Sequence, residues 1–511
     1  MTALLPGAVC SAVLMTVAFP KPALWFLAPF ALVPLLFAIH RKPAAVSCAR
    51  VFAACYACAA AWQLASLWWI GYVTIAGMLA LCLFVALIVA GALTLSWWLT
   101  RRGVPLWLSL PAAWMTYEAV VSYLMTGFPW LALGYTWQPR TAAIQIADLA
   151  GVYGVSFVII AGTAAVTQLL CALTGSSPFR PAVTALAIAG AAMAGSLAYG
   201  AARLGELDRE APERSIALAC VQANIPSNVK HDPRLDADVL RRHAYWTCEA
   251  AASNVDVILW SETALPGYFH ERGLSYHTVT GLVRRTGIPL LTGMATYDYR
   301  NGAITYHNSA CIIGTNALPG TAYDKMHLVV FGEYVPFEKY LPFLKLVTPI
   351  EGSFSAGSRP VLLELDTARA GRVSFGPLIC FEDVFGYMAR LMASAGADIL
   401  VNLTNDGWFR SSPGPYQHAA LSTFRAVETR RPLVRATNSG VTLAADRAGR
   451  ITHVLTDAGR RTELAGMLVA DIPVHAPRTT FYAAHGDWFL VLSCIVLVAT
   501  TIAACLRRVQ A

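Results

Sequence analysis

Charged residues are scarce in this chain of 511 residues. Asp, Glu, Lys and Arg together make up only 13% of it, whereas 56% of the residues are hydrophobic. Soluble globular domains contain about a quarter charged residues, so the composition excludes an ordinary soluble protein and predicts a membrane protein. Acids are rarest at the start, where residues 1–202 contain only Glu118 and Asp148. They become frequent from Glu206 onward, which predicts a membrane domain followed by a water-soluble one.

Signals for several other kinds of site are missing. The sequence has no phosphate-binding glycine loop, no cluster with metal-ligand spacing and no internal repeat. Cys55 and Cys58 have CxxC spacing, but they lie in an apolar run with no matching pair, so metal binding is not expected. The net charge of +8 is mostly explained by Lys and Arg around apolar runs, and nothing indicates nucleic-acid binding.

Long uncharged runs are the most prominent feature that is present. A run of about 18 residues or more can cross the ~30 Å hydrocarbon core of a bilayer as a helix. About eight spans are predicted, near residues 3–19, 23–39, 52–70, 75–99, 104–125, 151–173, 181–200 and 488–505.

The apolar residues 126–149 are interrupted by Pro129 and Gly134, which predicts a re-entrant or interfacial segment instead of a span. Trp130, Tyr135 and Trp137 in this segment are typical of a membrane–water interface.

Lys and Arg gather in one set of loops, which predicts the orientation of the chain. The positive-inside rule makes these loops cytoplasmic, and they carry Arg41, Lys42, Arg50, Arg101, Arg102, Arg180, Arg507 and Arg508. Lys21 and Arg140 fall on the other side. With seven spans before it, the segment of residues 203–485 is expected outside the cytoplasm. Residues 486–511 are expected to form a last span and a cytoplasmic tail.

The soluble segment alternates strand-like and helix-like stretches. Strand-like stretches such as RSIALACVQ, VDVILW, SFGPLI and ILVNLT end in turn residues, and amphipathic stretches such as ADVLRRHAYWTCEAA and QHAALSTFRAVETRR lie between them. This order predicts α/β layers in which helices cover a buried sheet. In such folds, side chains at the carboxyl ends of strands meet in a crevice.

Three reactive groups lie near such strand ends. Glu262 lies in ILWSETALP, Cys380 in SFGPLICFED and Lys325 in TAYDKMHLVVFGEY. A cysteine attacks a carbonyl as a thiolate and needs a base or a nearby positive charge. Glu262 can take the thiol proton, and Lys325 can stabilise an oxyanion together with the backbone N–H of Phe381. Each residue also has a structural alternative. Cys380 could be a buried core cysteine, Glu262 a polar residue at a strand end, and Lys325 a surface cation paired with Asp324.

These three stretches, in this order, resemble the Glu-Lys-Cys enzymes of the nitrilase superfamily, which fold as an α-β-β-α sandwich. The stretches DKMHLVVFGEYVPFE, NLTNDGWF, PYQHAALSTFRAVETRRPLVRATNSG, FPWLALGYTWQP and IADLAGVYGVSF are similar to the bacterial apolipoprotein N-acyltransferases. The resemblance covers almost the whole chain, including the seven predicted spans before the soluble segment and the one after it. The expected fold is therefore a polytopic α-helical membrane domain (residues 1–202), a nitrilase-like α/β catalytic domain (residues 203–485) and a C-terminal transmembrane helix (residues 486–511).

The resemblance implies an N-acyltransferase with Glu262, Lys325 and Cys380 as its catalytic triad. Cys380 would take a fatty acyl chain from a membrane phospholipid as a thioester. The α-amine of the diacylglyceryl-modified N-terminal cysteine of a lipoprotein would then accept it, which makes a ping-pong mechanism. The enzyme would be a multi-pass monomer of the bacterial cytoplasmic (inner) membrane, with its catalytic domain on the periplasmic side and no metal or cofactor.

The resemblance also assigns supporting roles. Glu333 is expected to position Lys325, and Glu382 to support the nucleophile beside Phe381. Two positions depart from the family pattern, because many relatives have Trp at the position of His231 and Tyr at that of Phe381. His231 is therefore a candidate substrate-contacting residue.

A thioester open to solvent would hydrolyse, so apolar side chains are expected to cover it. Phe331, Tyr334 and Phe337 are candidates for this cover, and Trp408 is either a lipid-contacting lid or a core residue. His418 and His327 are expected to be structural hydrogen-bonding residues.

Two other functions stay open. One is a membrane-tethered nitrilase-type amidohydrolase, in which water resolves the intermediate and the leading spans are not needed. The other is a transporter or scaffold with an incidental soluble domain. Transporters carry ionisable residues inside their spans, and Glu118 is the one clear intramembrane acid here. The sequence also leaves open whether two of Cys220, Cys248 and Cys311 form a disulfide.

Overall fold

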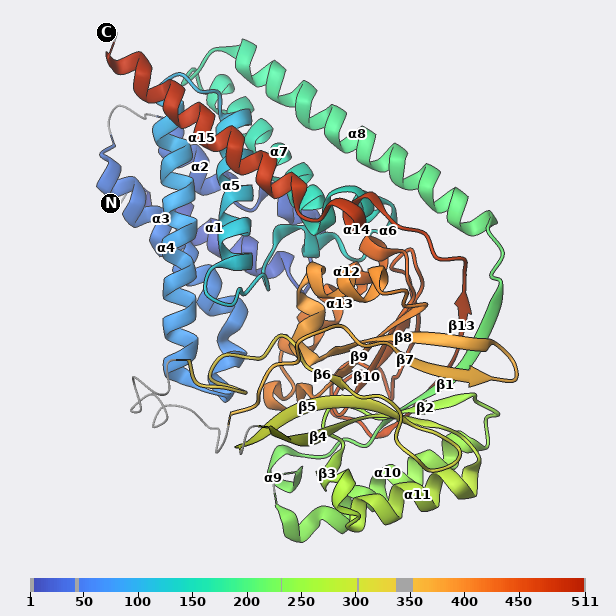
Figure 1. The fold of residues 1–511 in the computed structure, drawn as a ribbon. Helices are drawn as coiled ribbons and strands as arrows, with labels where there is room; N and C mark the ends of the chain where they lie inside the picture. The colour runs from blue at the N-terminus through green and yellow to red at the C-terminus, as the bar shows by residue number, and fades with distance from the viewer. Residues whose placement is uncertain (1–3, 42–45, 231, 301–302, 337–352, 510–511) are drawn as a thin grey trace. The chain divides into compact units, whose positions relative to one another are not determined.

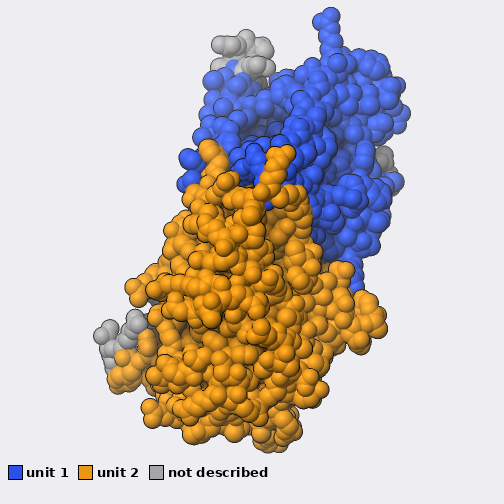
Figure 2. Space-filling model, turned by 90° about the vertical axis from the view of Figure 1, so that its right-hand side faces the viewer, with its two compact units in different colours: residues 1–207, 484–511 blue, residues 208–483 orange. Residues whose placement is uncertain are grey.

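The protein is described here by a computed structural model, drawn as a ribbon in Figure 1, over residues 4–41, 46–230, 232–300, 303–336 and 353–509. The chain divides into two compact units, which Figure 2 distinguishes by colour. The first unit comprises Met1–Leu207 with Ala484–Ala511, and the second comprises Asp208–Ala483.

The first unit is helical. Five helical segments in the described part of the chain are long and apolar enough to cross a membrane: Cys48–Tyr72, Ile75–Thr100, Ala147–Leu173, Phe179–Arg209 and Trp488–Leu506. The count of about eight spans stays a prediction. The helices are α1 (Leu5–Ala18), α2 (Val33–His40), α3 (Cys48–Leu67), α4 (Ile75–Thr100), α5 (Leu106–Tyr123), α6 (Thr141–Ile144), α7 (Ala147–Leu173), α8 (Phe179–Arg209) and α15 (Trp488–Val509).

Prolines shorten the first two apolar runs. Helix α1 ends at Ala18, and Phe19 is extended with ψ 159° because it precedes Pro20. In the second run, Pro29 lies in a 3₁₀ helix, Trp25–Phe30, and α2 begins only at Val33. Proline lacks the N–H that a continuous α-helix needs, so these runs form shorter helices than their apolar length predicts.

As the sequence predicted, residues 126–149 do not form one continuous helix. A 3₁₀ helix at Leu133–Trp137 and the single turn of α6 interrupt them. The side chains of Trp130, Tyr135 and Trp137 are all buried, and their position at the membrane–water interface stays a prediction.

The neighbouring helices explain this burial. The backbone N–H of Leu133 donates to Glu118 Oε1 of α5 at 2.9 Å, and that of Gly134 donates to Ser156 Oγ of α7 at 2.8 Å. A Cβ atom on Gly134 would lie 2.5 Å from the carbonyl oxygen of Val152, so only glycine permits this approach. Side chains of neighbouring helices thus satisfy the non-helical backbone of this segment.

The second unit contains two β-sheets. The first has the order β13–β1–β2–β4–β5–β6, with β3 paired to β4, and the second has the order β12–β11–β10–β9–β8–β7. The centre of each sheet is parallel, namely β1–β2–β4 and β8–β9–β10, and antiparallel strands flank it. The strands of the first sheet are β1 (Arg214–Gln222), β2 (Val257–Leu259), β3 (Leu265–Tyr268), β4 (Leu290–Arg300), β5 (Ala303–Ile313), β6 (Tyr323–Asp324) and β13 (Gly466–Val474). Those of the second are β7 (Leu363–Thr367), β8 (Gly371–Ile379), β9 (Ile399–Thr404), β10 (Leu433–Thr437), β11 (Leu443–Ala445) and β12 (Ile451–Val454).

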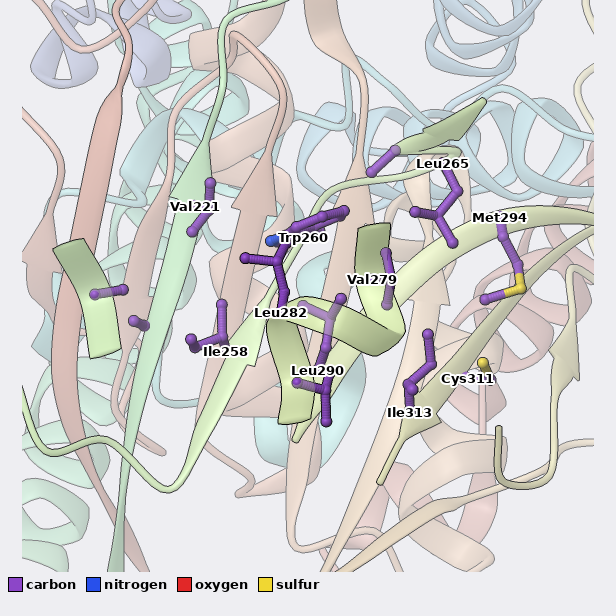
Figure 3. Close-up of a cluster of buried hydrophobic side chains, with 14 of the residues drawn as sticks. Val221, Ile258, Trp260, Leu265, Val279, Leu282, Leu290, Met294, Cys311 and Ile313 are labelled. Carbon is purple, nitrogen blue, oxygen red and sulfur yellow. The ribbon is translucent and has the colours of Figure 1, made fainter. Parts of the chain in front are cut away.

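Helices cover the outer face of each sheet, which confirms the predicted α/β layers. Figure 1 shows α10 (Asp236–Ala251) and α11 (Leu274–Thr286) against the first sheet, and α12 (Gly386–Ser394) and α13 (Gly414–Thr429) against the second. The core beneath α11 is drawn in Figure 3, where Val279 and Leu282 of the helix lie beside Trp260 and Leu290 of the sheet. The indole N–H of Trp260 donates to Thr247 Oγ1 at 2.9 Å, which satisfies the one polar atom of this fully buried side chain.

Candidate active site

The backbone that presents Glu262 is a tight turn after β2. Strand β2 ends at Leu259, and the residue after Glu262, Thr263, has φ +43°. This is the left-handed region, which L-residues other than glycine rarely adopt. Strand β4 packs directly against the turn, since a Cβ on Gly293 would lie 2.7 Å from Glu262 Cα. The general base proposed from the sequence therefore stands on a sterically fixed loop.

The Glu262 carboxylate is buried and has three partners. Oε1 accepts from Asn308 Nδ2 of β5 at 2.9 Å and lies 3.5 Å from Lys325 Nζ. Oε2 accepts from the backbone N–H of Asn405, just after β9, at 3.0 Å. The carboxylate thus joins groups from both sheets.

Lys325 follows β6 and is almost completely buried. Its Nζ lies 2.8 Å from both carboxylate oxygens of Glu333. Burial lowers the pKa of Lys325, but the nearby carboxylates of Glu333 and Glu262 outweigh it and raise the pKa above its usual value. The surface-pair alternative is therefore excluded, and Asp324 instead accepts from Ser309 Oγ at 2.6 Å.

Glu333 links this lysine to the loop that carries it. Oε1 accepts from Asn308 Nδ2 at 2.9 Å, and Oε2 accepts from the backbone N–H of Val329 at 2.8 Å. Asn308 therefore bridges the carboxylates of Glu262 and Glu333. A buried cation held by two hydrogen-bonded carboxylates is electrostatically balanced, whereas an isolated one would not be.

Cys380 directly follows β8 and begins a 3₁₀ helix, Cys380–Val384. Its φ of +51° lies in the left-handed region, so the thiol sits on a sharp strand-to-helix turn. The turn is held from β9, where Asn402 Nδ2 donates to the carbonyl oxygen of Cys380 at 3.0 Å. Burial raises the pKa of the Cys380 thiol well above its usual value, Glu262 raises it further, and Lys325 lowers it.

Glu382 ties the cysteine turn to the lysine loop. Its Oε2 accepts from the backbone N–H of Ile379, the residue before Cys380, at 2.7 Å. Its Oε1 accepts from Tyr323 Oη and from the backbone N–H groups of Met326 and His327 at 2.7–3.0 Å. Burial raises the pKa of Glu382 to about 7, although Lys325 and these hydrogen bonds lower it.

Two family models match the chain. "Apolipoprotein N-acyltransferase N-terminal domain" matches residues 11–166, and "Carbon-nitrogen hydrolase" matches residues 217–480. The curated apolipoprotein N-acyltransferase of Geobacter metallireducens is 34% identical to this chain, over 98% of this chain and 95% of its own length. This chain belongs to the apolipoprotein N-acyltransferase family.

Other relatives have the same name. The apolipoprotein N-acyltransferase of Brucella melitensis is 31% identical over 85% of this chain and 82% of that protein. Among solved structures, a nitrilase-superfamily member from Saccharomyces cerevisiae is 17% identical, with a TM-score of 0.38, and the match covers 51% of this chain and 91% of that one. The carbon-nitrogen hydrolase match includes Glu262, Lys325 and Cys380, and it assigns the nitrilase-like α/β fold to the second unit.

In this member of the N-acyltransferase family, a buried ionic network includes Asp383 of the 3₁₀ helix that begins at Cys380. Arg435 of β10 donates to Asp383 Oδ2 at 2.8 Å and to Asp406 Oδ2 at 2.7 Å. His418 of α13 lies 2.8 Å from both aspartates, through Nε2 to Asp383 and through Nδ1 to Asp406. The pKa of His418 is lowered by burial and by Arg435, but the two aspartates outweigh these effects and raise it. The expected structural role of His418 agrees with these contacts.

The predicted substrate-contacting residues differ in exposure. Phe331 is 38% exposed and Trp408 is 40% exposed, so neither is a core residue. Tyr334 is half-buried, and its carbonyl oxygen accepts from the backbone N–H of Phe331 at 2.8 Å. His231 and Phe337 lie outside the described residues.

Phe381, the residue after Cys380, is half-buried. It makes an edge contact with Phe385 at a centroid distance of 5.1 Å and lies 5.9 Å from the ring of His327. His327 Nδ1 is 2.6 Å from Tyr387 Oη, which agrees with the structural role expected for this histidine.

Three polar residues of the site were not predicted from the sequence. Asn308 and Asn402 lie inside strands, and Lys230 ends the single turn of α9, Ser227–Lys230. An amide inside an otherwise apolar strand, as in HNSACII and ILVNLT, is the signal that could have identified the two asparagines.

The described residues contain no group of three or more His, Cys, Asp or Glu side chains that could hold a metal ion. Cys220, Cys248 and Cys311 are all free thiols, so the disulfide that the sequence left open is not formed.

Proposed function

We propose that this protein is an apolipoprotein N-acyltransferase, which moves a fatty acyl chain from a membrane phospholipid to the α-amino group of the N-terminal diacylglyceryl-cysteine of lipoproteins. Membership of the family supports the overall activity. The observation that carries the mechanism is the buried cluster in which Lys325 pairs with Glu262 and Glu333 and acts on the thiol of Cys380.

In the first step, Glu262 takes the thiol proton while Sγ of Cys380 attacks the carbonyl carbon of the phospholipid ester. The raised pKa of the thiol means that it rests as a neutral SH group, so a base is required. The oxyanion of the tetrahedral intermediate is stabilised by Lys325 and the backbone N–H of Phe381. When the ester C–O bond breaks, Glu262 returns the proton to the leaving alcohol, and a thioester remains on Cys380.

In the second step, the lipoprotein amine attacks the thioester carbonyl. Glu262 takes a proton from the nitrogen, the C–S bond breaks, and the proton passes to the thiolate, which restores the resting enzyme. Removing the general base is expected to slow either step by a factor of ~10² to 10⁴. Glu333 and Glu382 support these steps by positioning Lys325 and the nucleophile turn.

Water must be excluded between the two steps, since a hydrolysed thioester would release free fatty acid. The aromatic side chains of Phe331, Tyr334 and Trp408 are suited to contact an acyl chain, because they are apolar and partly exposed. An amidohydrolase would use the same triad with water as the acceptor, so the identity of the acceptor decides between the two enzymes.

The proposed enzyme is a monomer of the bacterial inner membrane. About eight spans hold it there, seven of them before the catalytic domain and one after it, and the catalytic domain faces the periplasm. The five long apolar helices and the Arg-bearing loops support this arrangement. Both substrates are lipid-anchored, so a membrane-embedded enzyme meets them at their own depth.

The activity is tested by incubating the purified protein with phospholipid and a diacylated lipopeptide that has a free α-amine. Mass spectrometry should show one added acyl chain, and an N-acetylated lipopeptide should gain none. Free fatty acid formed at the same rate with and without the amine, and no triacylated peptide, would identify a hydrolase instead.

A further inference from the structure

A second lysine lies at the turn that presents the general base. Lys230 ends α9 and is half-buried. Its Nζ donates to the backbone carbonyl oxygen of Glu262 at 3.0 Å and to Thr263 Oγ1 at 2.8 Å. These contacts reach the main chain of the base, whereas Lys325 contacts its carboxylate.

The turn needs such support because its backbone is strained. Thr263 has φ +43°, and a β-branched residue in this region is a genuine outlier. Strained backbone persists only where surrounding contacts hold it. On one side the support comes from Gly293 of β4, where any Cβ would collide with the turn. On the other side it comes from Lys230, which binds the carbonyl oxygen before the strained residue and the side chain of that residue.

We propose that Lys230 is a positioning residue for the general base: its ammonium group holds the Glu262–Thr263 turn and so aims the Glu262 carboxylate at the Cys380 thiol. The inference rests on the proposed function, in which Glu262 is that base. Lys230 acts through Glu262 and touches no reacting atom.

The charge of Lys230 is set by its burial and by two facing groups, Glu262 and Cys380. Burial lowers the pKa of Lys230 to about 8, although the negative charges available at Glu262 and Cys380 raise it. On the side of α10, burial and the charge of Lys230 together lower the pKa of His243 to about 4, so this histidine is neutral wherever Lys230 titrates. Lys325 keeps its proton throughout this range, because its pKa is raised above the usual value.

A pH dependence follows from this difference between the two lysines. As pH rises through about 8, Lys230 releases a proton and loses both its charge and one N–H donor. Its hold on the turn weakens, and so does the positive potential at Cys380. Formation of the thioester should therefore decline above about pH 8 in the wild-type protein.

The test measures the single-turnover rate of thioester formation from phospholipid, without an amine acceptor, from about pH 6 to about pH 10. Lys230→Met should lower the rate at pH 7 by about 10²-fold, the size of effect that misplacement of a catalytic group produces. Lys230→Arg keeps a permanent charge, so its rate at pH 7 should be at least about tenfold higher than that of Lys230→Met. Its rate should also stay constant to a higher pH than the wild-type rate does. Arg241→Met is the matched control, because Arg241 is an exposed cation on α10 paired with Asp238, and it should behave as wild type.

Glu262→Gln separates this inference from the proposed function. If Glu262→Gln is inactive and Lys230→Met retains the wild-type rate, Lys230 is not a positioning residue while the base assignment stands. If Glu262→Gln is fully active, the proposed mechanism itself fails. Should Lys230→Met not fold, as judged by thermal unfolding in detergent, the Arg variant decides alone. An alkaline decline that is identical in wild type and Lys230→Arg would overturn the inference.

Discussion

At the scale of single residues, the pKa of the Cys380 thiol depends on groups with opposing effects. Burial and the Glu262 carboxylate raise the pKa of its thiol, and Lys325 lowers it. The net effect favours a resting thiol. In the proposed mechanism, proton transfer to Glu262 creates the thiolate beside Lys325, so charge forms only where it can be stabilised.

Glu382 should be intolerant even of an isosteric change. Glu382→Gln replaces one carboxylate oxygen by an NH₂ group. This group must then face N–H or O–H groups that donate hydrogen bonds to the carboxylate in the wild-type protein. Leaving a buried donor unsatisfied costs about 1–3 kcal/mol. We expect a lower unfolding temperature and slower thioester formation. Glu364→Gln, at an exposed carboxylate paired with Arg372, is the control. Wild-type behaviour of both variants would show that Glu382 does not organise the site.

Phe381 departs from the tyrosine of many relatives, but its ring already fills the position. The ring is half-buried and packs edge-on against Phe385. The expected electrostatic contribution of this residue comes from its backbone N–H, which the substitution keeps. Phe381→Tyr should therefore change the acyl-transfer rate by less than about tenfold, which is about 1.4 kcal/mol of barrier. A larger gain in rate would show that the hydroxyl takes part in the reaction.

The sequence alone predicted the three candidate residues, because each lies beside a recognisable strand end. It did not predict Asn308, which bridges Glu262 and Glu333 from the middle of β5. Nor did it identify Lys230, whose contacts with the Glu262 turn arise only when the end of α9 lies against the loop that follows β2. Residues of this kind are defined by contacts between distant segments, and a single sequence carries no record of them.

At the scale of elements, the site depends on how closely β4 approaches the loop after β2. Gly293 lies where any side chain would meet Glu262 Cα and the Thr263 nitrogen at 2.7 Å, and both are backbone atoms that cannot rotate away. The close contact with β4 therefore fixes the position of Glu262, the proposed general base. The approach of two backbones, and not flexibility, explains why this position is glycine.

Gly293→Ala should displace the base. We expect thioester formation to fall by about 10²-fold, because misplacing a catalytic group by about 1 Å has this effect. Gly281→Ala in α11 is the matched control, since no atom lies within 4 Å of the added Cβ. That substitution should leave the rate unchanged and stabilise the helix by up to about 1 kcal/mol. Equal rates for the two variants would contradict the role of Gly293 in positioning Glu262.

The main alternating elements were predictable because their apolar runs have clear periods, namely β1, β2, β4, β5, β8, β9, β10 and helices α10 to α13. The short elements β3, β6, β7, β12 and α9 were not predicted. Strand β13 was not predicted, because Pro473 weakens its strand pattern. Proline is tolerated at the edge of a sheet, and β13 is the edge strand beside β1. Similarly, the burial of Trp130 could not be foreseen, since aromatic residues suit both an interface and a protein interior.

At the scale of the whole molecule, the chain combines apolar helices with a nitrilase-like α/β unit. The proposed orientation rests on the distribution of Lys and Arg among the loops. A tag after Ala511 should be cytoplasmic, and a protease site near Ala211 should be cleaved from the periplasmic side in intact spheroplasts. Cleavage near Ala211 only after the membrane is breached would reverse the topology and remove the enzyme from its lipoprotein substrates.

The most direct test of the mechanism is the acyl-enzyme itself. Purified protein given labelled phospholipid and no amine should accumulate a label that hydroxylamine removes, as expected of a thioester. Cys380→Ala should carry no label, and Glu262→Gln and Lys325→Ala should acquire it slowly. A diacylated lipopeptide with a free α-amine should then discharge the label to triacylated product. Label that persists on Cys380→Ala, or that leaves wild type at one rate with and without the amine, would contradict acyl transfer through Cys380.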